Sequence, residues 1–149
     1  MPTNIKLNFN NIIKTPILFI IFNRPDTTKK VFDAIKKYRP AKLFITADGP
    51  RCDKPEEWRI CEEARKITEN IDWPCKVKRL YREKNLGCKL AVSGAIDWFF
   101  KNMEEGIILE DDCIPDQTFF GFCGEMLRKY RNNNNVFHIA KRSTAAPFV

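Results

Sequence analysis

One stretch of the chain constrains the fold more than any other: residues 106–112, Gly-Ile-Ile-Leu-Glu-Asp-Asp. Three consecutive apolar residues run directly into three carboxylates. This pattern indicates a strand that is buried on both faces and ends at a polar site, as strands of parallel sheets commonly do. Because successive side chains of a strand point to opposite faces, we expect Glu110 and Asp112 on one side and Asp111 on the other.

Short apolar runs and helical patterns alternate along the rest of the chain. The runs that predict strands are residues 16–22, 42–47, 75–81, 106–110 and 136–139. Helices are predicted from Pro25-Asp26 to Arg39, from Asp53 to Trp73-Pro74, over residues 88–103, and from Asp116 onward. The order βαβαβαβαβ predicts an α/β fold of three layers, with a mostly parallel sheet covered by helices on both faces.

In such sheets ligands bind beyond the carboxyl ends of the strands. Polar residues follow the predicted strands there, namely Asn23, Arg24, Asp48, Arg51, Arg82, Asn85, Glu110, Asp111 and Asp112. Adjacent carboxylates repel one another, so we expect a divalent cation with oxygen ligands, Mg²⁺ or Mn²⁺, at the fourth strand end. The alternative is that these acids only cap the helix that begins at Asp116. Convergence of four strand ends favours the ligand site.

Composition restricts the class of protein and its partners. A net charge of +7 and a pI near 9.2 favour an anionic ligand. The six cysteines are never closer than nine residues apart and the chain has one histidine, which excludes a zinc knuckle. No dinucleotide or P-loop glycine motif occurs. Without a signal peptide or a membrane-length apolar run, we expect a cytoplasmic protein whose basic charge allows contact with the inner face of the membrane.

In this order and spacing the motifs resemble nucleotide-sugar glycosyltransferases of the GT-A fold, within the family typified by N-acetylglucosaminyltransferase I and its bacterial relatives. The resemblance covers residues 15–140. It rests on the opening strand ending in Asn23-Arg24, on Asp48-Gly49, on residues 87–100, and on Glu110-Asp111-Asp112 followed by Pro115-Asp116 and Phe119-Phe120. Residues 1–14 remain as an irregular arm and residues 141–149 as an atypical tail.

The resemblance implies a metal-dependent transferase that uses a UDP-sugar, with UDP-N-acetylglucosamine as one candidate donor, and glycosylates a glycan acceptor. Asp112 would bind Mn²⁺ or Mg²⁺, and Glu110 and Asp111 would lie against the ribose and the donor sugar. Asp48 matches the carboxylate that recognises the uracil ring. The remaining implied donor contacts are Asn23, Arg24 and Lys89. Nucleic acid is not an expected partner.

One departure from the family concerns the end of the chain. Family members continue past the fifth strand into a half that binds the acceptor and supplies the general base, so we expect this chain to be truncated, and no base can be named. An uncovered sheet edge would favour self-association.

Three alternatives to the transferase remain. The first is a non-catalytic nucleotide-sugar-binding fragment. The second is a receiver-type regulatory domain phosphorylated on Asp48, although receivers carry acids where this chain has Asn23-Arg24. The third is a basic nucleic-acid-binding module, which ranks last because the aromatic residues mostly occupy core-type positions.

Overall fold

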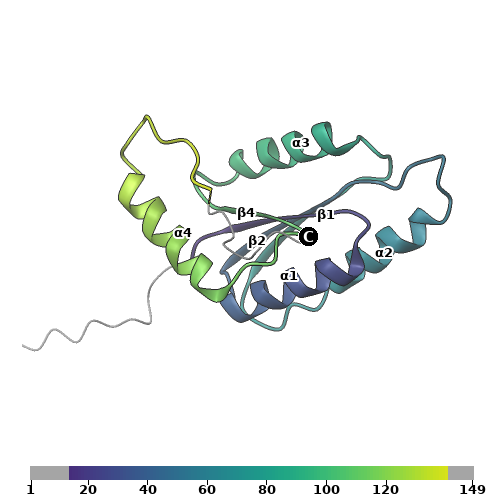
Figure 1. Ribbon diagram of the computed structural model, residues 1–149, viewed down its shortest axis with the longest axis horizontal. Coiled ribbons are helices and arrows are strands. Elements are labelled where there is room, and N and C mark those ends of the chain that lie inside the picture. Colours follow the sequence, from purple (N-terminus) through teal and green to yellow (C-terminus); the bar gives the residue numbers. More distant parts are fainter. Residues whose placement is uncertain (1–13, 141–149) are drawn as a thin grey trace, which may run out of the picture.

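The computed structural model describes residues 14–140, which form a parallel four-stranded sheet flanked by helices (Figure 1). In chain order the elements are β1 (Ile17–Ile21), α1 (Pro25–Tyr38), β2 (Lys42–Ala47), α2 (Glu57–Ile67), β3 (Lys76–Tyr81), α3 (Cys88–Phe100), β4 (Ile107–Glu110) and α4 (Gln117–Tyr130). The strand order is β3-β2-β1-β4. The predicted α/β fold with helices on both faces of a parallel sheet is confirmed. The predicted tail and, apart from Lys14, the predicted arm lie outside the described residues.

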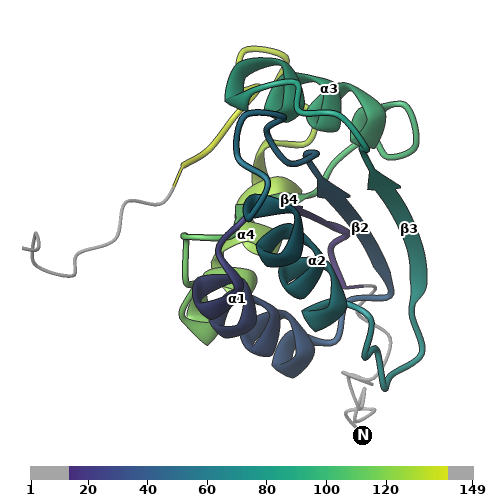
Figure 2. The same cartoon turned by 90° about the vertical axis from the view of Figure 1, so that its right-hand side faces the viewer.

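Alternating side chains of the central strand β1 divide the core into two layers. Ile17, Phe19 and Ile21 pack with residues of α1 and with Phe120 of α4 in the larger cluster. Leu18 and Ile20 face the other way, into a cluster with residues of β2 and α3. Figures 1 and 2 show α3 on one side of the sheet and the other helices on the opposite side. Both faces of β1 are therefore buried, as its apolar sequence predicts.

Local sequence explains where α1 begins and ends. Pro25 occupies the first turn, where its missing N–H costs nothing, and Asp26 complements the helix dipole. Arg39 adopts a left-handed conformation with φ of 55° and donates its N–H to the carbonyl of Ile35, which closes the last turn. The longest described helices, α1 and α4, have 14 residues each. None of the described helices has the length and apolarity that a membrane span requires.

The second helix is shorter than the sequence predicts. It begins at Glu57, not at Asp53, because residues 51–57 form tight turns in which the Lys54 N–H bonds to the Arg51 carbonyl. It ends at Ile67, since the hydroxyl of Thr68 turns back to the carbonyl of Arg65 at 2.8 Å. The third helix likewise ends at Phe100 instead of residue 103.

The predicted fifth strand, residues 136–139, is wrong. These residues have no regular secondary structure, and Phe137 is 93% exposed. A short apolar run becomes a strand only where its backbone pairs with a neighbour, and in the described sheet the edge strand β4 pairs with β1 alone. Residues 136–139 instead line an apolar groove of about 500 Å³ together with residues of α3, β4 and α4.

Candidate functional site

The carboxyl ends of the four strands lie at one edge of the sheet. Ile21 is in register with Ala47, which is in register with Tyr81, and Glu110 is level with Ile20. The loop after each strand therefore begins at a similar height. Because the strands are parallel, all the polar residues that the sequence placed after them belong to this same edge.

Residues 110–112, which we call the acidic turn, contain one buried and two exposed carboxylates. Asp111 is 7% exposed and accepts a hydrogen bond of 2.9 Å from the backbone N–H of Phe22. Burial raises the pKa of Asp111 above its ordinary value, and the Phe22 hydrogen bond opposes that rise. Glu110 and Asp112 are exposed. This division agrees with the expected opposite orientation, although β4 already ends at Glu110.

Arg24 lies directly against the acidic turn. Its Nη1 is 2.5 Å from Oδ2 of Asp112 and 3.7 Å from Oδ1 of Asp111. The hydrogen bond to Asp112 is the main cause of a pKa of Arg24 above its ordinary value. A guanidinium therefore offsets part of the negative charge at the fourth strand end, and it comes from the loop after β1, 88 residues earlier in the chain.

The acidic turn does not supply the cap of the following helix. Asp116 occupies the N-cap of α4, and its side chain accepts a hydrogen bond of 2.8 Å from the backbone N–H of Thr118. The carboxylates of Asp111 and Asp112 are directed to the β1–α1 loop instead. This arrangement removes the main argument for reading the acidic turn as a helix cap.

Asp48, at the end of β2, organises the neighbouring loop after β3. Its carboxylate is 7% exposed and accepts hydrogen bonds from the backbone N–H groups of Gly49, Leu86 and Gly87, at 2.9 to 3.2 Å. The side-chain amide of Asn85 donates to the same carboxylate at 3.1 Å. Four donors thus hold a nearly buried carboxylate, which ties the ends of β2 and β3 together.

Glu57 is a buried acid that was not among the predicted site residues, and it connects two more of the strand-end residues. Its side chain is 4% exposed. It accepts hydrogen bonds from the Asn23 amide at 2.8 Å and from the backbone N–H and guanidinium of Arg51. Chiefly through Arg51, the pKa of Glu57 falls from 4.5 to about 2. In a sequence, a glutamate at a helix start is expected to interact with the helix dipole. The only sequence signal for this hydrogen-bonded cluster was therefore Arg51, six residues earlier.

Residues 22–24 join these contacts at the centre of the edge. The Phe22 N–H bonds to Asp111, and its ring lies beneath the guanidinium of Arg51, with 6.0 Å from Cζ to the ring centre. The next two residues, Asn23 and Arg24, reach Glu57 and Asp112 in opposite directions. Three consecutive residues after β1 therefore fix the loop after β2 and the acidic turn relative to each other.

Two predicted features find less support in the geometry. Lys89 is exposed on the first turn of α3, and within residues 14–140 no hydrogen bond or ion pair joins it to the acidic turn. In the same part of the chain no group of three or more His, Cys, Asp or Glu side chains is arranged to hold a metal ion. Glu110 and Asp112 nevertheless offer two exposed carboxylates, and Mg²⁺ commonly takes one or two carboxylates with water and phosphate oxygens completing its shell.

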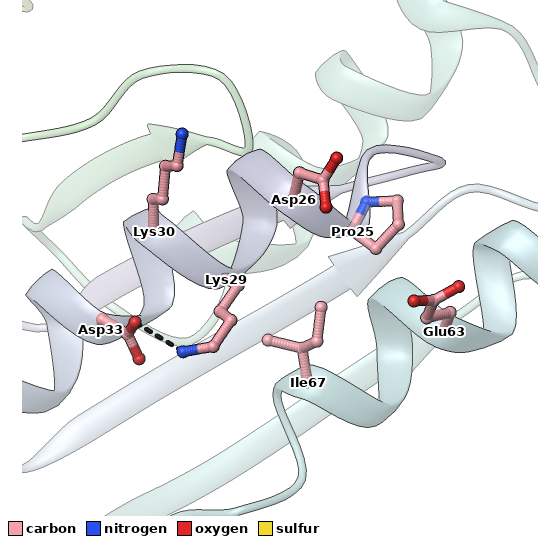
Figure 3. Close-up of a pocket in the computed structure, with 7 residues that line it drawn as sticks. All are labelled: Pro25, Asp26, Lys29, Lys30, Asp33, Glu63 and Ile67. Carbon is pink, nitrogen blue, oxygen red and sulfur yellow. Dashed lines mark hydrogen bonds and ion pairs between the residues drawn. The ribbon is translucent and has the colours of Figure 1, made fainter.

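An open groove of about 660 Å³ lies between α1 and α2 (Figure 3). Its lining carries charges of both signs, and Lys29 bonds to Asp33 across one helical turn at 2.8 Å. Only Pro25 and Asp26 belong to the start of α1, next to the strand ends, and the other lining residues lie along the two helices. Its charged residues are exposed, and an exposed pair such as Lys29–Asp33 is common on helix surfaces. We therefore place the candidate site at the strand ends.

Comparison of the chain with protein-family models found no match. Comparison with curated proteins found none either.

Proposed function

We propose that residues 15–140 are the donor-binding portion of a metal-dependent glycosyltransferase of the GT-A type, which uses a UDP-sugar and a glycan acceptor. The observation that carries the proposal is the position of Arg24 against the acidic turn. A nucleoside diphosphate bound through a divalent ion needs both charges in one place: carboxylates for the ion and a cation for the phosphates. The end of a parallel sheet is where such a ligand binds.

Each residue has a separate role in this proposal. Asp112, with Glu110 beside it, would hold Mn²⁺ or Mg²⁺, and the ion would neutralise charge on the diphosphate leaving group. Arg24 binds the phosphates from the loop after β1. Asp111 is buried and accepts a hydrogen bond from the Phe22 N–H, so it positions that loop. Lys89, exposed on the first turn of α3, is a further donor contact in the proposal.

The geometry disfavours the receiver-type alternative. Phosphorylation of Asp48 requires a carboxylate that a phosphodonor can reach. Asp48 is 7% exposed and is held by three backbone N–H groups and one side-chain amide. To attack phosphorus, its oxygens would have to break these hydrogen bonds. Several donors would then be left unpaired, which costs free energy.

Calorimetric titration with UDP and UDP-N-acetylglucosamine, in Mn²⁺ and again in EDTA, tests the proposal. We expect micromolar-class binding that requires the metal and is lost in Asp112→Asn. Asp33→Asn, an equivalent change in an exposed pair on α1, serves as the matched control and should bind as the wild type does. Binding that persists in EDTA, or that is equally strong in Asp112→Asn, would contradict the proposal.

A further inference from the structure

The side-chain amide of Asn85, in the loop between β3 and α3, has its orientation fixed by two acceptors. Its Nδ2 donates to Oδ2 of Asp48 at 3.1 Å and to the carbonyl oxygen of Gly49 at 2.8 Å. Both amide hydrogens are therefore used on the β2 side. The carbonyl Oδ1 must point away from Asp48 and Gly49, because it lies opposite Nδ2 on the planar amide.

The backbone around this amide is closely packed. A Cβ added at Gly49 would lie 2.5 Å from the carbonyl carbon of Lys84 and 2.7 Å from backbone atoms of Glu83. The loops after β2 and β3 thus touch through their backbones at that point. The Asn85 amide is presented from a rigid platform, which is what a specific contact requires.

Asp48 itself has little capacity left for a ligand. An ionised carboxylate offers about four lone-pair positions. Those of Asp48 are taken by the N–H groups of Gly49, Leu86 and Gly87 and by the Asn85 amide. A nucleobase could bond to Asp48 only by displacing one of these donors. The accessible acceptor next to it is the Oδ1 of Asn85, which is half-buried and has no hydrogen-bond donor within residues 14–140.

We propose that Oδ1 of Asn85 accepts the imide N–H of the donor's base, uracil N3–H, and that Asp48 is the positioning residue that fixes the Asn85 amide in the accepting orientation. The inference rests on the proposed function, in which the ligand is a uridine nucleotide. It changes the role of Asp48 from a direct base contact to an indirect one. Uracil carries a hydrogen at N3 where cytosine carries a lone pair, so an acceptor fixed opposite N3 selects uracil and repels cytosine.

The test uses UDP and 3-methyl-UDP, in which a methyl group replaces the N3 hydrogen. Affinities are measured by calorimetry in Mn²⁺ for the wild type, Asn85→Ala and Asn134→Ala. The last is an identical change at an exposed position in the turn after α4. One neutral hydrogen bond corresponds to about three- to tenfold in affinity. We expect the wild type and Asn134→Ala to prefer UDP by that factor, and Asn85→Ala to bind both ligands equally weakly.

Asp48→Asn tests the positioning role. Its own amide group would present a donor where Asp48 presents an acceptor, so that Nδ2 of Asn85 keeps only the Gly49 carbonyl and Oδ1 is no longer held toward the base. We expect this variant to lose the preference for UDP over 3-methyl-UDP while thermal unfolding still shows a cooperative transition. If it fails to fold, Asn85→Ala still decides the base contact on which the inference depends. A preference for UDP retained in a folded Asp48→Asn would overturn the positioning role.

The two proposals fail in different ways. If the wild type binds UDP in Mn²⁺ but does not discriminate against 3-methyl-UDP, or if Asn85→Ala discriminates as well as the wild type does, the role of Asn85 is refuted and the proposed function stands. If the wild type binds neither nucleotide, the proposed function is refuted and the role of Asn85 falls with it.

Discussion

Substitution of Glu57 by glutamine should destabilise the protein in a way that depends on pH. The carboxylate is buried, and four donors from Asn23 and Arg51 surround it. A fall of the pKa from 4.5 to about 2 corresponds to about 3 kcal/mol of stability if solvent does not screen the pair. Because the Arg51 side chain is 42% exposed, we expect roughly 1 to 2 kcal/mol.

The sign of the pH dependence follows from the direction of the shift. The folded state has the lower pKa, so the stabilisation is fully present above pH 4.5 and is lost as the pH falls toward 2. Wild type and Glu57→Gln should therefore differ most at neutral pH and converge as the pH approaches 2.

Urea denaturation measured at neutral pH and at successively lower pH, with tryptophan fluorescence as the signal, gives the free energies of unfolding. Glu63→Gln provides the control, since Glu63 lies on the same helix and is exposed. It should change stability by less than about 0.5 kcal/mol. An equally stable Glu57→Gln at neutral pH, or a deficit that does not shrink in acid, would refute the reasoning.

Two further substitutions have expected outcomes. Arg24→Ala removes an ion pair whose arginine side chain is 56% exposed, so thermal unfolding should show a loss of stability below about 1 kcal/mol. Calorimetry should show UDP binding about tenfold weaker or more, because hydrogen bonds to charged groups are strong. Unchanged UDP affinity would contradict the role of Arg24. Gly106→Ala places a Cβ into the ring of Phe99 and 2.9 Å from the Pro16 carbonyl oxygen. Chemical denaturation should therefore show the free energy of unfolding reduced by about 1 to 3 kcal/mol. A fully stable variant would show that the buried Phe99 ring can move.

Much of the sheet could be predicted because its signal is local. Residues 17–21 are buried on both faces, as their all-apolar sequence predicts, and polar residues mark where each strand stops. Residues 107–109 also form the predicted strand, but the prediction that both of its faces are buried is wrong, because β4 lies at the edge of the sheet and Ile108 is exposed. The run 136–139 carries a similar local signal and yet forms no strand, because its fate depends on a pairing partner that the sequence pattern cannot reveal. Strand prediction therefore succeeded where burial alone decides and failed where pairing decides.

The site was predicted at the level of residue types and only partly at the level of contacts. Chain order identified the strand ends, so Arg24 and Asp112 could be assigned to one edge of the sheet. Their ion pair spans 88 residues and depends on β1 being placed next to β4, which is a property of the topology. Glu57 was missed for the same reason, since its partner Asn23 belongs to another loop.

Exposed apolar surface beside β4 supports the expectation of self-association, which remains a prediction. Phe100, Ile108 and Phe137 are 46%, 37% and 93% exposed around the apolar groove. Contiguous apolar surface of this kind commonly marks an interaction site. Sedimentation velocity over a range of concentrations would show an increase in mass if the chain associates with itself, and a constant monomer mass would contradict the prediction.

The most direct test of the central claim is to locate the metal. In an isotope-labelled sample with UDP, substoichiometric Mn²⁺ broadens the amide resonances of residues close to it. The claim predicts that broadening is strongest for residues 22–24 and 110–113, that it is weak at the opposite ends of the strands, such as Lys42 and Lys76, and that it disappears in Asp112→Asn. Broadening centred on the groove between α1 and α2, or equal broadening in Asp112→Asn, would contradict it.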